Sequence, residues 1–167
     1  MRGEVNFRLA VGADAPALAA MSRDFVETGL GWSWLPARVR HHVRAADSVV
    51  LVAQQQTRVV GFAIMRFGVE DAHLDLLAVR PRQRRSGIGR GLVEWLEKSA
   101  LVAGLSVVYL EVRAGNAQAL AFYETLGYRR VQRLPGYYQG RESALRMARD
   151  LWCPAPSGAT GKSRGAR

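Results

Sequence analysis

The residues with the clearest chemical potential lie between Val79 and Leu92, where the chain reads Val-Arg-Pro-Arg-Gln-Arg-Arg-Ser-Gly-Ile-Gly-Arg-Gly-Leu. Five arginines and three glycines gather here, between an apolar segment that suits a strand and an apolar periodicity that suits a helix. The first N–H groups of a helix have no partner within the helix and lie at the positive end of its dipole. An anion at this junction therefore meets donors already aimed at it, and the arginines add charge-assisted hydrogen bonds, so the segment predicts a phosphate-binding loop.

The spacing of this loop excludes two common nucleotide-binding signatures. Walker A requires Gly, four residues and then Gly-Lys-Ser/Thr, and no such run occurs. The Rossmann fingerprint requires a Gly or Ala three residues after Gly89, and that position is Leu92. The remaining pattern is Val79-x-Pro81-x-x-Arg84-x-x-Gly87-x-Gly89. It resembles the Arg/Gln-x-x-Gly-x-Gly/Ala signature of the GNAT superfamily of N-acetyltransferases. In that superfamily the loop holds the pyrophosphate of acetyl-coenzyme A.

Two later segments extend this resemblance. The first is Leu110-Glu111-Val112-Arg113-Ala114-Gly115-Asn116-x-x-Ala119-x-x-Phe122-Tyr123-Glu124-x-x-Gly127-Tyr128. The second is Tyr137-Tyr138-x-Gly140-Arg141-Glu142-x-Ala144-Leu145-x-Met147. Together with the loop they are similar to the branch of the family that includes ribosomal-protein alanine N-acetyltransferases. The resemblance covers residues 72–147 and implies an acetyl-CoA-dependent N-acetyltransferase.

The resemblance also implies where the coenzyme binds. In the family two adjacent parallel strands, here 74–79 and 107–112, splay apart, and the pantetheine arm pairs with free main-chain groups in the gap as an added strand would. A main-chain N–H of the first strand then stabilises the oxyanion as an amine attacks the thioester. The expected coenzyme-binding residues are Leu77, Ala78, Val79, Arg84, Arg85, Ser86, Gly87, Ile88, Gly89, Arg90, Asn116 and Tyr123.

Tyr123 is the candidate general acid. It matches the family's tyrosine whose hydroxyl faces the coenzyme sulfur, and a leaving thiolate benefits from a proton donor. The alternative is that Phe122 and Tyr123 are an aromatic pair that packs their helix. Asn116 has an alternative as well, because asparagine is a good helix N-cap.

The general base has two candidates. The acceptor amine must lose a proton, and a carboxylate is the usual base. Alignment on Ala78-Val79-x-Pro81 places Asp71 where the alanine N-acetyltransferase branch has a glutamate, although aspartate is one methylene shorter. Glu111 is the second candidate, and pairing with Arg113 or with a main-chain group is its structural alternative.

Tyr137 and Tyr138 match paired tyrosines that bind the peptide N-terminus in this branch, and core packing is their alternative role. If they line the acceptor site, a protein or peptide N-terminal α-amine is the favoured acceptor. A small-molecule amine is the rival within the same class, because a fold does not identify the acceptor.

Apolar periodicity places the elements that must position these residues. Strands are expected at residues 7–11, 48–53, 59–67, 74–79, 105–112, 128–132 and 143–151, with helices beginning near Asp14 and Pro36 and others over 88–100 and 117–126. Leu74, Leu76 and Ala78 should share one face of their strand, and residues 134–140 should form a loop. The expected fold class is α+β, the GNAT fold: a single mixed, mostly antiparallel sheet with a central parallel splayed strand pair and helices on both faces.

Length and composition set the remaining bounds. At 167 residues we expect one domain over residues 1–152 and a disordered basic tail over 153–167. A single cysteine and scattered histidines give no disulfide and no zinc spacing, so no metal cofactor is expected. No apolar run approaches the ~18 to 20 residues of a membrane span, and the first residues lack a signal-peptide pattern, so a cytoplasmic location is expected.

The net charge of +10 favours polyanionic partners of several kinds. It leaves two functions of another class open: an RNA- or ribosome-binding module, and a non-catalytic protein that binds coenzyme A.

Overall fold

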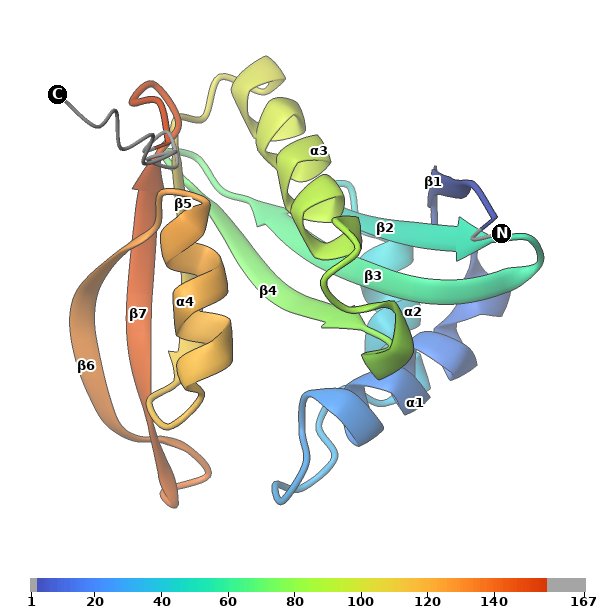
Figure 1. Ribbon diagram of the computed structural model, residues 1–167, viewed down its shortest axis with the longest axis horizontal. Helices are drawn as coiled ribbons and strands as arrows, with labels where there is room; N and C mark the ends of the chain where they lie inside the picture. Colours follow the sequence, from blue (N-terminus) through green and yellow to red (C-terminus); the bar gives the residue numbers. More distant parts are fainter. Residues whose placement is uncertain (1–2, 156–167) are drawn as a thin grey trace, which may run out of the picture.

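The computed structural model describes residues 3–155 and builds them into one seven-stranded sheet with helices on both faces (Figure 1). The helices are α1 (Ala15–Phe25), α2 (Pro36–Arg44), α3 (Ile88–Val102) and α4 (Ala117–Thr125), with short 3-10 turns η1 (Gly12–Asp14) and η2 (Pro81–Gln83). The strands are β1 (Val5–Leu9), β2 (Ser48–Gln55), β3 (Arg58–Phe67), β4 (Ala72–Val79), β5 (Val107–Arg113), β6 (Arg129–Tyr138) and β7 (Glu142–Asp150).

The strand order β1-β2-β3-β4-β5-β7-β6 makes a mixed sheet in which β4 and β5 are the parallel pair and the other neighbours are antiparallel. Parallel neighbours need a crossover connection, and α3 supplies it. The expected fold class is confirmed, including the central position of the parallel pair.

Each face of the sheet has its own core. One core joins α3 and α4 to the sheet through side chains such as Leu92, Leu96 and Leu110, all essentially inaccessible. The other joins α1 and α2 to β2, β3 and β4 through Leu18, Val39 and others. The helix pair α1–α2 therefore covers the first half of the sheet on one face, and α3 and α4 cover the opposite face.

A bulge in β4 changes which side chains of this strand point to each face of the sheet. Met65 pairs with Leu74 and Ile64 pairs with Leu76, so Asp75 has no partner on β3. An extra residue on one strand reverses the alternation of side chains beyond it. Leu74 consequently lies in the core beneath α3, whereas Leu76 lies in the core beneath α1 and α2. The prediction that Leu74, Leu76 and Ala78 share one face is wrong.

Tertiary pairing also moves several boundaries. The first strand is Val5–Leu9 rather than 7–11, because it pairs with β2 and the chain then turns where Asp14 accepts a hydrogen bond from the Val11 N–H at 2.8 Å. The strand β2 extends to Gln55, which leaves Gln56 and Thr57 as the turn. Gln54 and Gln55 pair with Asn6 and Val5 of β1, and this pairing outweighs the low strand preference of a polar segment.

The region 134–140 is mostly strand, contrary to the predicted loop. The strand β6 continues to Tyr138 and pairs with β7 on both sides of two register shifts, at Arg130/Gln132 and Leu134/Tyr138. The second shift contains Pro135, which lacks the N–H that a regular ladder requires. Tyr137 and Tyr138 therefore lie at the end of a strand.

Of the predicted tail, residues 153–155 follow β7 and residues 156–167 lie outside the described part of the chain. Within residues 3–155, no helix has the length and apolar character that crossing a membrane requires.

Candidate functional site

The site is a gap that opens between β4 and β5. These strands pair only through Ala72 with Val108 and His73 with Tyr109, and then they diverge (Figure 1). Beyond His73, no strand among residues 3–155 lies beside the edge of β4 that faces β5, while its other edge stays paired with β3 as far as Val79. Because alternate residues of a strand direct N–H and C=O groups to opposite edges, half of the main-chain groups from Leu74 to Val79 face the gap.

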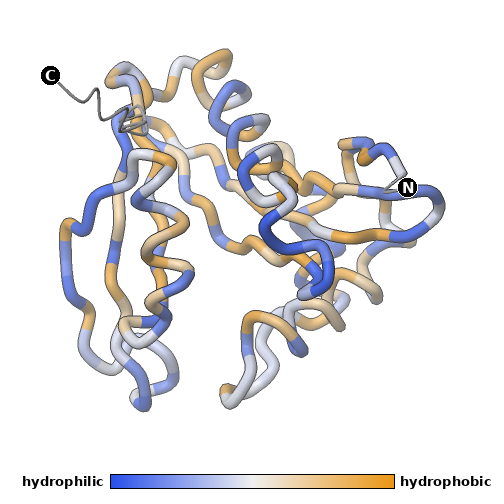
Figure 2. The backbone as a smooth tube through the Cα atoms, in the orientation of Figure 1, coloured by the Kyte–Doolittle hydropathy of each residue, from blue (hydrophilic) through white to orange (hydrophobic). Residues whose placement is uncertain are grey.

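The arginine- and glycine-rich loop lies at the open end of the gap, before α3. In Figure 2 it is a continuous hydrophilic stretch beside the apolar strands. Gly87 has φ of 85° and open space where a side chain would begin, and Gly89 lies against Phe122 of α4. The residues 84–87 are exposed, and the first N–H groups of α3 are free by helix geometry. This surface can hold an anion.

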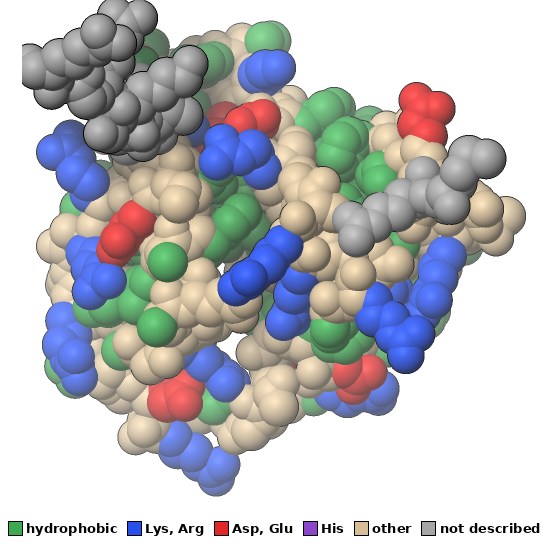
Figure 3. All heavy atoms as spheres, in the orientation of Figure 1, with side chains coloured by type: hydrophobic (Ala, Val, Ile, Leu, Met, Phe, Trp, Pro, Cys, Tyr) green, Lys and Arg blue, Asp and Glu red, His purple; other side chains and the backbone are tan. Residues whose placement is uncertain are grey.

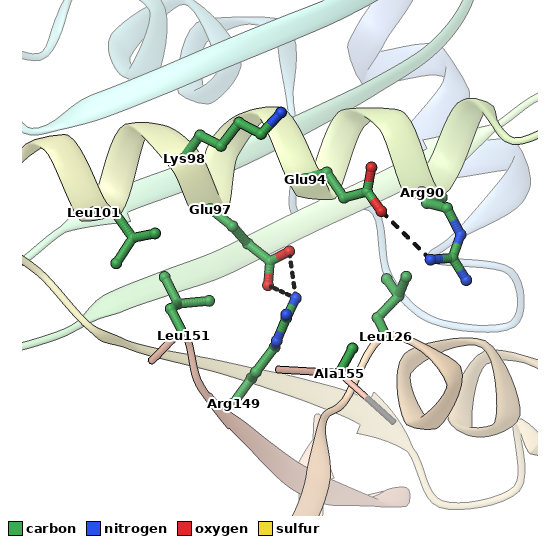
Figure 4. Close-up of a pocket in the computed structure, with 9 residues that line it drawn as sticks. All are labelled: Arg90, Glu94, Glu97, Lys98, Leu101, Leu126, Arg149, Leu151 and Ala155. Atoms are coloured by element: carbon green, nitrogen blue, oxygen red, sulfur yellow. Dashed lines mark hydrogen bonds and ion pairs between the residues drawn. The ribbon is translucent and has the colours of Figure 1, made fainter. Parts of the chain in front are cut away.

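Two of the predicted loop arginines are engaged by the protein itself. Arg84 Nε donates to the Val79 carbonyl at 3.1 Å, which links the loop to the end of β4. Arg90 Nη1 lies 3.4 Å from a carboxylate oxygen of Glu94. Figure 4 shows Arg90 and Glu94 at the edge of a cavity of about 170 Å³, on the side of α3 that faces β7. The guanidinium of Arg90 therefore points away from the first turn of α3.

That cavity contains a buried ion pair with a structural role. Arg149 Nη1 of β7 lies 2.7 and 2.8 Å from the two carboxylate oxygens of Glu97 on α3 (Figure 4). Tyr128 donates a hydrogen bond to the same carboxylate at 3.2 Å. Burial outweighs these partners and raises the pKa of Glu97. The pair fixes α3 to β7, and neither Glu97 nor Arg149 belongs to the gap.

A charged network crosses the sheet at the closed end of the gap. His73 lies between two carboxylates, with Nδ1 2.5 Å from Asp75 and Nε2 2.6 Å from Glu111. Arg66 of β3 binds Asp75 through Nε and Nη2, and Arg146 Nε of β7 donates to Glu111 at 2.9 Å. Five side chains from four strands thus alternate in charge, and Glu111 stands at the point where β5 leaves β4.

The network determines the ionisation of its members. Burial opposes the charge on His73, but hydrogen bonds to Asp75 and Glu111 outweigh it and raise the pKa of the imidazole to about 9. Burial also disfavours the Glu111 carboxylate, yet His73 and Arg146 outweigh this effect and lower its pKa. The resting site therefore holds an imidazolium between two ionised carboxylates.

Tyr123 lies on the opposite face of the sheet from Glu111. It is buried on α4 among Phe122 and Tyr128, with ring centroids 5.0 and 5.6 Å away. Burial raises the pKa of its phenol, so the hydroxyl stays protonated at neutral pH. Asn116 caps the same helix, because its Oδ1 accepts from the Ala119 N–H at 3.1 Å.

Tyr138 is the last residue of β6 and pairs with Glu142 of β7. The phenol is half-buried, and burial and the neighbouring Tyr137 and Glu111 raise its pKa. Tyr138 also contributes, after burial, to the raised pKa of Tyr123. Arg113 of β5 lies with its guanidinium carbon 6.0 Å from the Tyr138 ring, and it pairs with Glu142 at 3.1 Å.

The structure separates the two candidate bases. Asp71 precedes β4 in the turn from β3, where its carbonyl accepts from the Gly68 N–H at 2.8 Å. It lies beyond the Ala72–His73 pairs that close the gap. Glu111 instead occupies the inner end of the gap. The Glu111 carboxylate pairs with His73 and Arg146, whereas Arg113, the partner that the sequence suggested, pairs with Glu142.

Sequence reasoning missed His73, Asp75, Arg66 and Arg146. Their proximity depends on the order β3-β4-β5-β7 and on the bulge at Asp75, and neither is written in a local pattern. The only sequence signal was the presence of two ionisable residues, His73 and Asp75, within an otherwise apolar strand.

The chain is similar in sequence and in structure to known acetyltransferases. The model of the Acetyltransferase (GNAT) family matches residues 18–128. The ribosomal protein bS18-alanine N-acetyltransferase of Escherichia coli is 39% identical over 97 residues, which are 56% of this chain and 66% of that protein. The chain thus spans just under two thirds of that relative's length. The N-alpha-acetyltransferase of Sulfurisphaera tokodaii is 32% identical over 123 residues, 66% of this chain and 74% of that protein.

Among solved structures, the ribosomal-protein-S18-alanine N-acetyltransferase from Escherichia coli superposes with a TM-score of 0.77 and 27% identity. The match covers 94% of this chain and 98% of that one, so the similarity includes the first strands and helices as well as the gap.

Proposed function

The chain belongs to the GNAT family of acetyltransferases, and from that premise we propose that it transfers the acetyl group of acetyl-CoA directly to the N-terminal α-amine of a protein. The observation that carries this proposal is the divergence of β4 and β5 with Glu111 on one face of the gap and Tyr123 on the other. Donor and acceptor can approach from opposite faces of the sheet and meet between the strands.

The residues present fit acetyl-CoA as the donor. Main-chain groups of Leu77 and Ala78 on the edge that faces the gap suit an extended amide-containing arm, which pairs as an added strand would, whereas the Val79 carbonyl already accepts from Arg84 Nε. The open surface at Gly87 and the first turn of α3 suit a pyrophosphate. Arg85 and Ser86 flank that surface, and we assign Asn116 and Tyr123, at the start and in the middle of α4, to the coenzyme side of the gap.

The chemistry needs one proton acceptor and one proton donor. As the amine nitrogen bonds to the thioester carbon, the Glu111 carboxylate accepts the proton that the nitrogen loses, directly or through a water. A main-chain N–H of β4 stabilises the developing oxyanion. The carbon–sulfur bond then breaks, and the Tyr123 hydroxyl donates its proton to the leaving thiolate.

We prefer Glu111 to Asp71 as the base because of position and charge. Glu111 lies at the inner end of the gap with its pKa lowered, so it is ionised at neutral pH. A carboxylate of low pKa is a weak base, and it suits an α-amine, whose pKa of about 8 leaves a sizeable neutral fraction. A lysine amine, with a pKa about 2.5 units higher, is a poorer acceptor for the same site.

The relatives support a protein N-terminus as acceptor, because one is described as a ribosomal protein alanine N-acetyltransferase and another as an N-alpha-acetyltransferase. We assign Tyr137 and Tyr138, at the end of β6, to the wall that contacts the first acceptor residues. A cytoplasmic location follows from this proposal, since acetyl-CoA and nascent protein chains occur there.

Release of free thiol from acetyl-CoA in the presence of short peptides tests the proposal. Peptides that vary in the first residue should support turnover, and mass spectrometry should locate the acetyl group on the α-amine. Acetylation of small amines with no turnover of any peptide would exclude a protein acceptor. Silence with every amine, together with tight coenzyme binding, would indicate a non-catalytic coenzyme A-binding protein.

A further inference from the structure

The charged network at the inner end of the gap has two layers. The carboxylates of Asp75 and Glu111 lie beneath, with side chains only 7% and 6% exposed. The guanidiniums of Arg66 and Arg146 lie above them, with side chains 50% and 36% exposed. Because the anions are buried and the cations are exposed, a molecule that reaches this surface meets positive charge first.

Both arginines lie on the face of the sheet that we assign to the acceptor. Leu110 and Val112 of β5 belong to the core beneath α3 and α4, so Glu111 between them points to the opposite face. Arg146 is the cross-strand partner of Glu111 on β7, and such partners share a face. The hydrogen bonds that run from Glu111 through the network to Arg66 keep the second guanidinium on this face too.

Each guanidinium keeps a nitrogen that the network does not use. Asp75 accepts from Nε and Nη2 of Arg66 at 2.5 and 2.9 Å. Glu111 accepts from Nε of Arg146 at 2.9 Å, and Gln132 accepts from its Nη1 at 3.4 Å. Within residues 3–155, Nη1 of Arg66 and Nη2 of Arg146 make no hydrogen bond. Two charged donors beside the base are thus available to an incoming molecule.

The network also has one positive charge in excess. Arg66, Arg146 and the His73 imidazolium oppose only the two carboxylates of Asp75 and Glu111. Figure 3 shows further Lys and Arg side chains around the opening between the half of the molecule that contains β5, β6 and β7 and the half that contains α1 and α2. Such a surface repels a peptide whose first residues are basic and attracts one whose first residues are acidic.

We propose that Arg66 and Arg146 select acceptors whose second residue is acidic, Asp or Glu. This inference rests on the proposed function and adds the substrate class. An extended chain advances ~3.3 Å per residue, so with the α-amine at Glu111 the second side chain comes within reach of guanidiniums that lie beside the same carboxylate. An acidic side chain there accepts charge-assisted hydrogen bonds from the two unused nitrogens, whereas a lysine side chain is repelled by both arginines.

Two substitutions remove the selecting charges one at a time. Arg66→Gln removes the guanidinium that Asp75 and His73 separate from the base. Arg146→Gln removes the other, together with a donor to Glu111. Comparison of peptides within one variant cancels any damage to the base, because the chemical step is the same for each peptide.

Arg130→Gln is the matched control for both substitutions. Arg130 is also a strand arginine, 53% exposed, and its Nε lies 2.8 Å from a single carboxylate. That carboxylate belongs to Glu124 of α4, which covers the face of the sheet opposite the acceptor. The control therefore removes an exposed, paired guanidinium of the same kind from the wrong side of the sheet.

The experiment uses three peptides of equal length that begin with alanine and differ only at the second residue, which is Glu, Gln or Lys. Acetyl-CoA is saturating, and mass spectrometry quantifies the acetylated peptide. For wild type, kcat/KM should be about tenfold higher with the Glu peptide than with the Gln peptide, and lower still with the Lys peptide. The Glu-to-Gln ratio should fall by about threefold or more in Arg66→Gln and in Arg146→Gln, and it should keep the wild-type value in Arg130→Gln.

Each other outcome is decisive. Similar kcat/KM values for the three peptides with wild type, or a preference for the Lys peptide, would overturn the inference while leaving the proposed function intact. A preference for the Glu peptide that is unchanged in both arginine variants would overturn the assignment to Arg66 and Arg146. The wild-type comparison needs no substitution, so it decides the preference even where a variant fails to fold. Absence of wild-type turnover on every peptide would overturn the proposed function, and the inference with it.

Discussion

At the scale of single residues, the position of Glu111 relative to Asp71 makes the assignment of the base testable. Glu111→Gln keeps the size of the side chain but removes the proton acceptor between His73 and Arg146. We expect kcat for peptide acetylation to fall by about 10²- to 10⁴-fold, with coenzyme binding retained because the loop and the edge of β4 are untouched. Steady-state kinetics with acetyl-CoA and a peptide measures this loss.

Asp71→Asn is the matched control for that substitution, since it neutralises the other candidate base in a turn beyond the closed end of the gap. It should leave kcat within about twofold of wild type, as expected for a group outside the site. The reverse pattern, a large loss in Asp71→Asn and a small one in Glu111→Gln, would transfer the role to Asp71.

Tyr123 offers a second residue-scale prediction. Tyr123→Phe retains the aromatic contacts with Phe122 and Tyr128 and removes only the hydroxyl. If that hydroxyl protonates the leaving thiolate, kcat should fall by about 10²-fold or more while the Kd for acetyl-CoA stays within a factor of a few. Tyr128→Phe, which removes a hydroxyl bonded to Glu97 outside the gap, should instead lower stability and spare kcat. Unchanged turnover in Tyr123→Phe would remove it as the acid.

His73 predicts a pH dependence of stability. Its pKa is raised from about 6.5 to about 9 in the folded protein. Because the folded value is the higher one, the stabilisation is complete below about pH 6.5 and is lost as pH rises through about 9. It amounts to at most about 3 kcal/mol, equivalent to several degrees in Tm.

Thermal denaturation of wild type and His73→Gln between about pH 6 and 10 tests this. The fall of Tm across that window should be smaller in His73→Gln than in wild type. His41→Gln, which changes an exposed imidazole on α2, should keep the wild-type slope. Parallel curves for wild type and His73→Gln would show that the network does not hold the charge on His73.

At the scale of elements, sequence patterns predicted α3 and α4 well because their signals are local. Apolar spacing, the Asn116 cap and the left-handed Gly104 and Gly127 after the helices act within a few residues. The turn between β4 and α3 was predictable for the same reason. The bulge at Asp75 and the length of β6 were not, since both depend on partners that are distant in sequence. The charged network could not be predicted either, because the bulge and the strand order bring its side chains together.

The packing of α3 on β3 gives an element-scale prediction. At Gly61 an added Cβ would lie 3.1 Å from the Ala78 carbonyl and 3.2 Å from Ile88 Cγ2, at the first turn of α3. Gly61→Val should therefore cost about 1–3 kcal/mol and should also weaken coenzyme binding, because it displaces the N–H groups that we assign to the pyrophosphate. Gly12→Ala, where nothing lies within 4 Å, should change neither property. Calorimetry of coenzyme binding beside Tm measurements checks both effects, and loss of stability with unchanged affinity would separate Gly61 from the binding loop.

At the scale of the whole molecule, the net charge of +10 suits two competing ligands for the arginine-rich surface, a coenzyme and a nucleic acid. Figure 3 shows Lys and Arg side chains around the opening, where they could serve a coenzyme or a nucleic acid. The two uses differ in their dependence on salt. RNA binding through several phosphates weakens steeply as salt rises, because condensed counterions are released. A coenzyme bound by helix N–H groups and the β4 main chain should lose much less affinity as salt rises.

Thermal stability with each ligand decides between these uses. Acetyl-CoA at ~100 times its Kd should add about 2.7 kcal/mol, which corresponds to a rise in Tm of roughly 5–10 °C for a chain of this size. Most of that rise should persist at about 0.5 M salt, where screening confines the attraction between exposed charges to a few ångströms. Polyuridylate should give a smaller rise that disappears at this salt concentration. No rise with acetyl-CoA, combined with a large and salt-sensitive rise with polyuridylate, would assign the surface to nucleic acid. A salt-resistant rise with acetyl-CoA would indicate that backbone geometry at the gap selects the ligand and that the surface charge only attracts it.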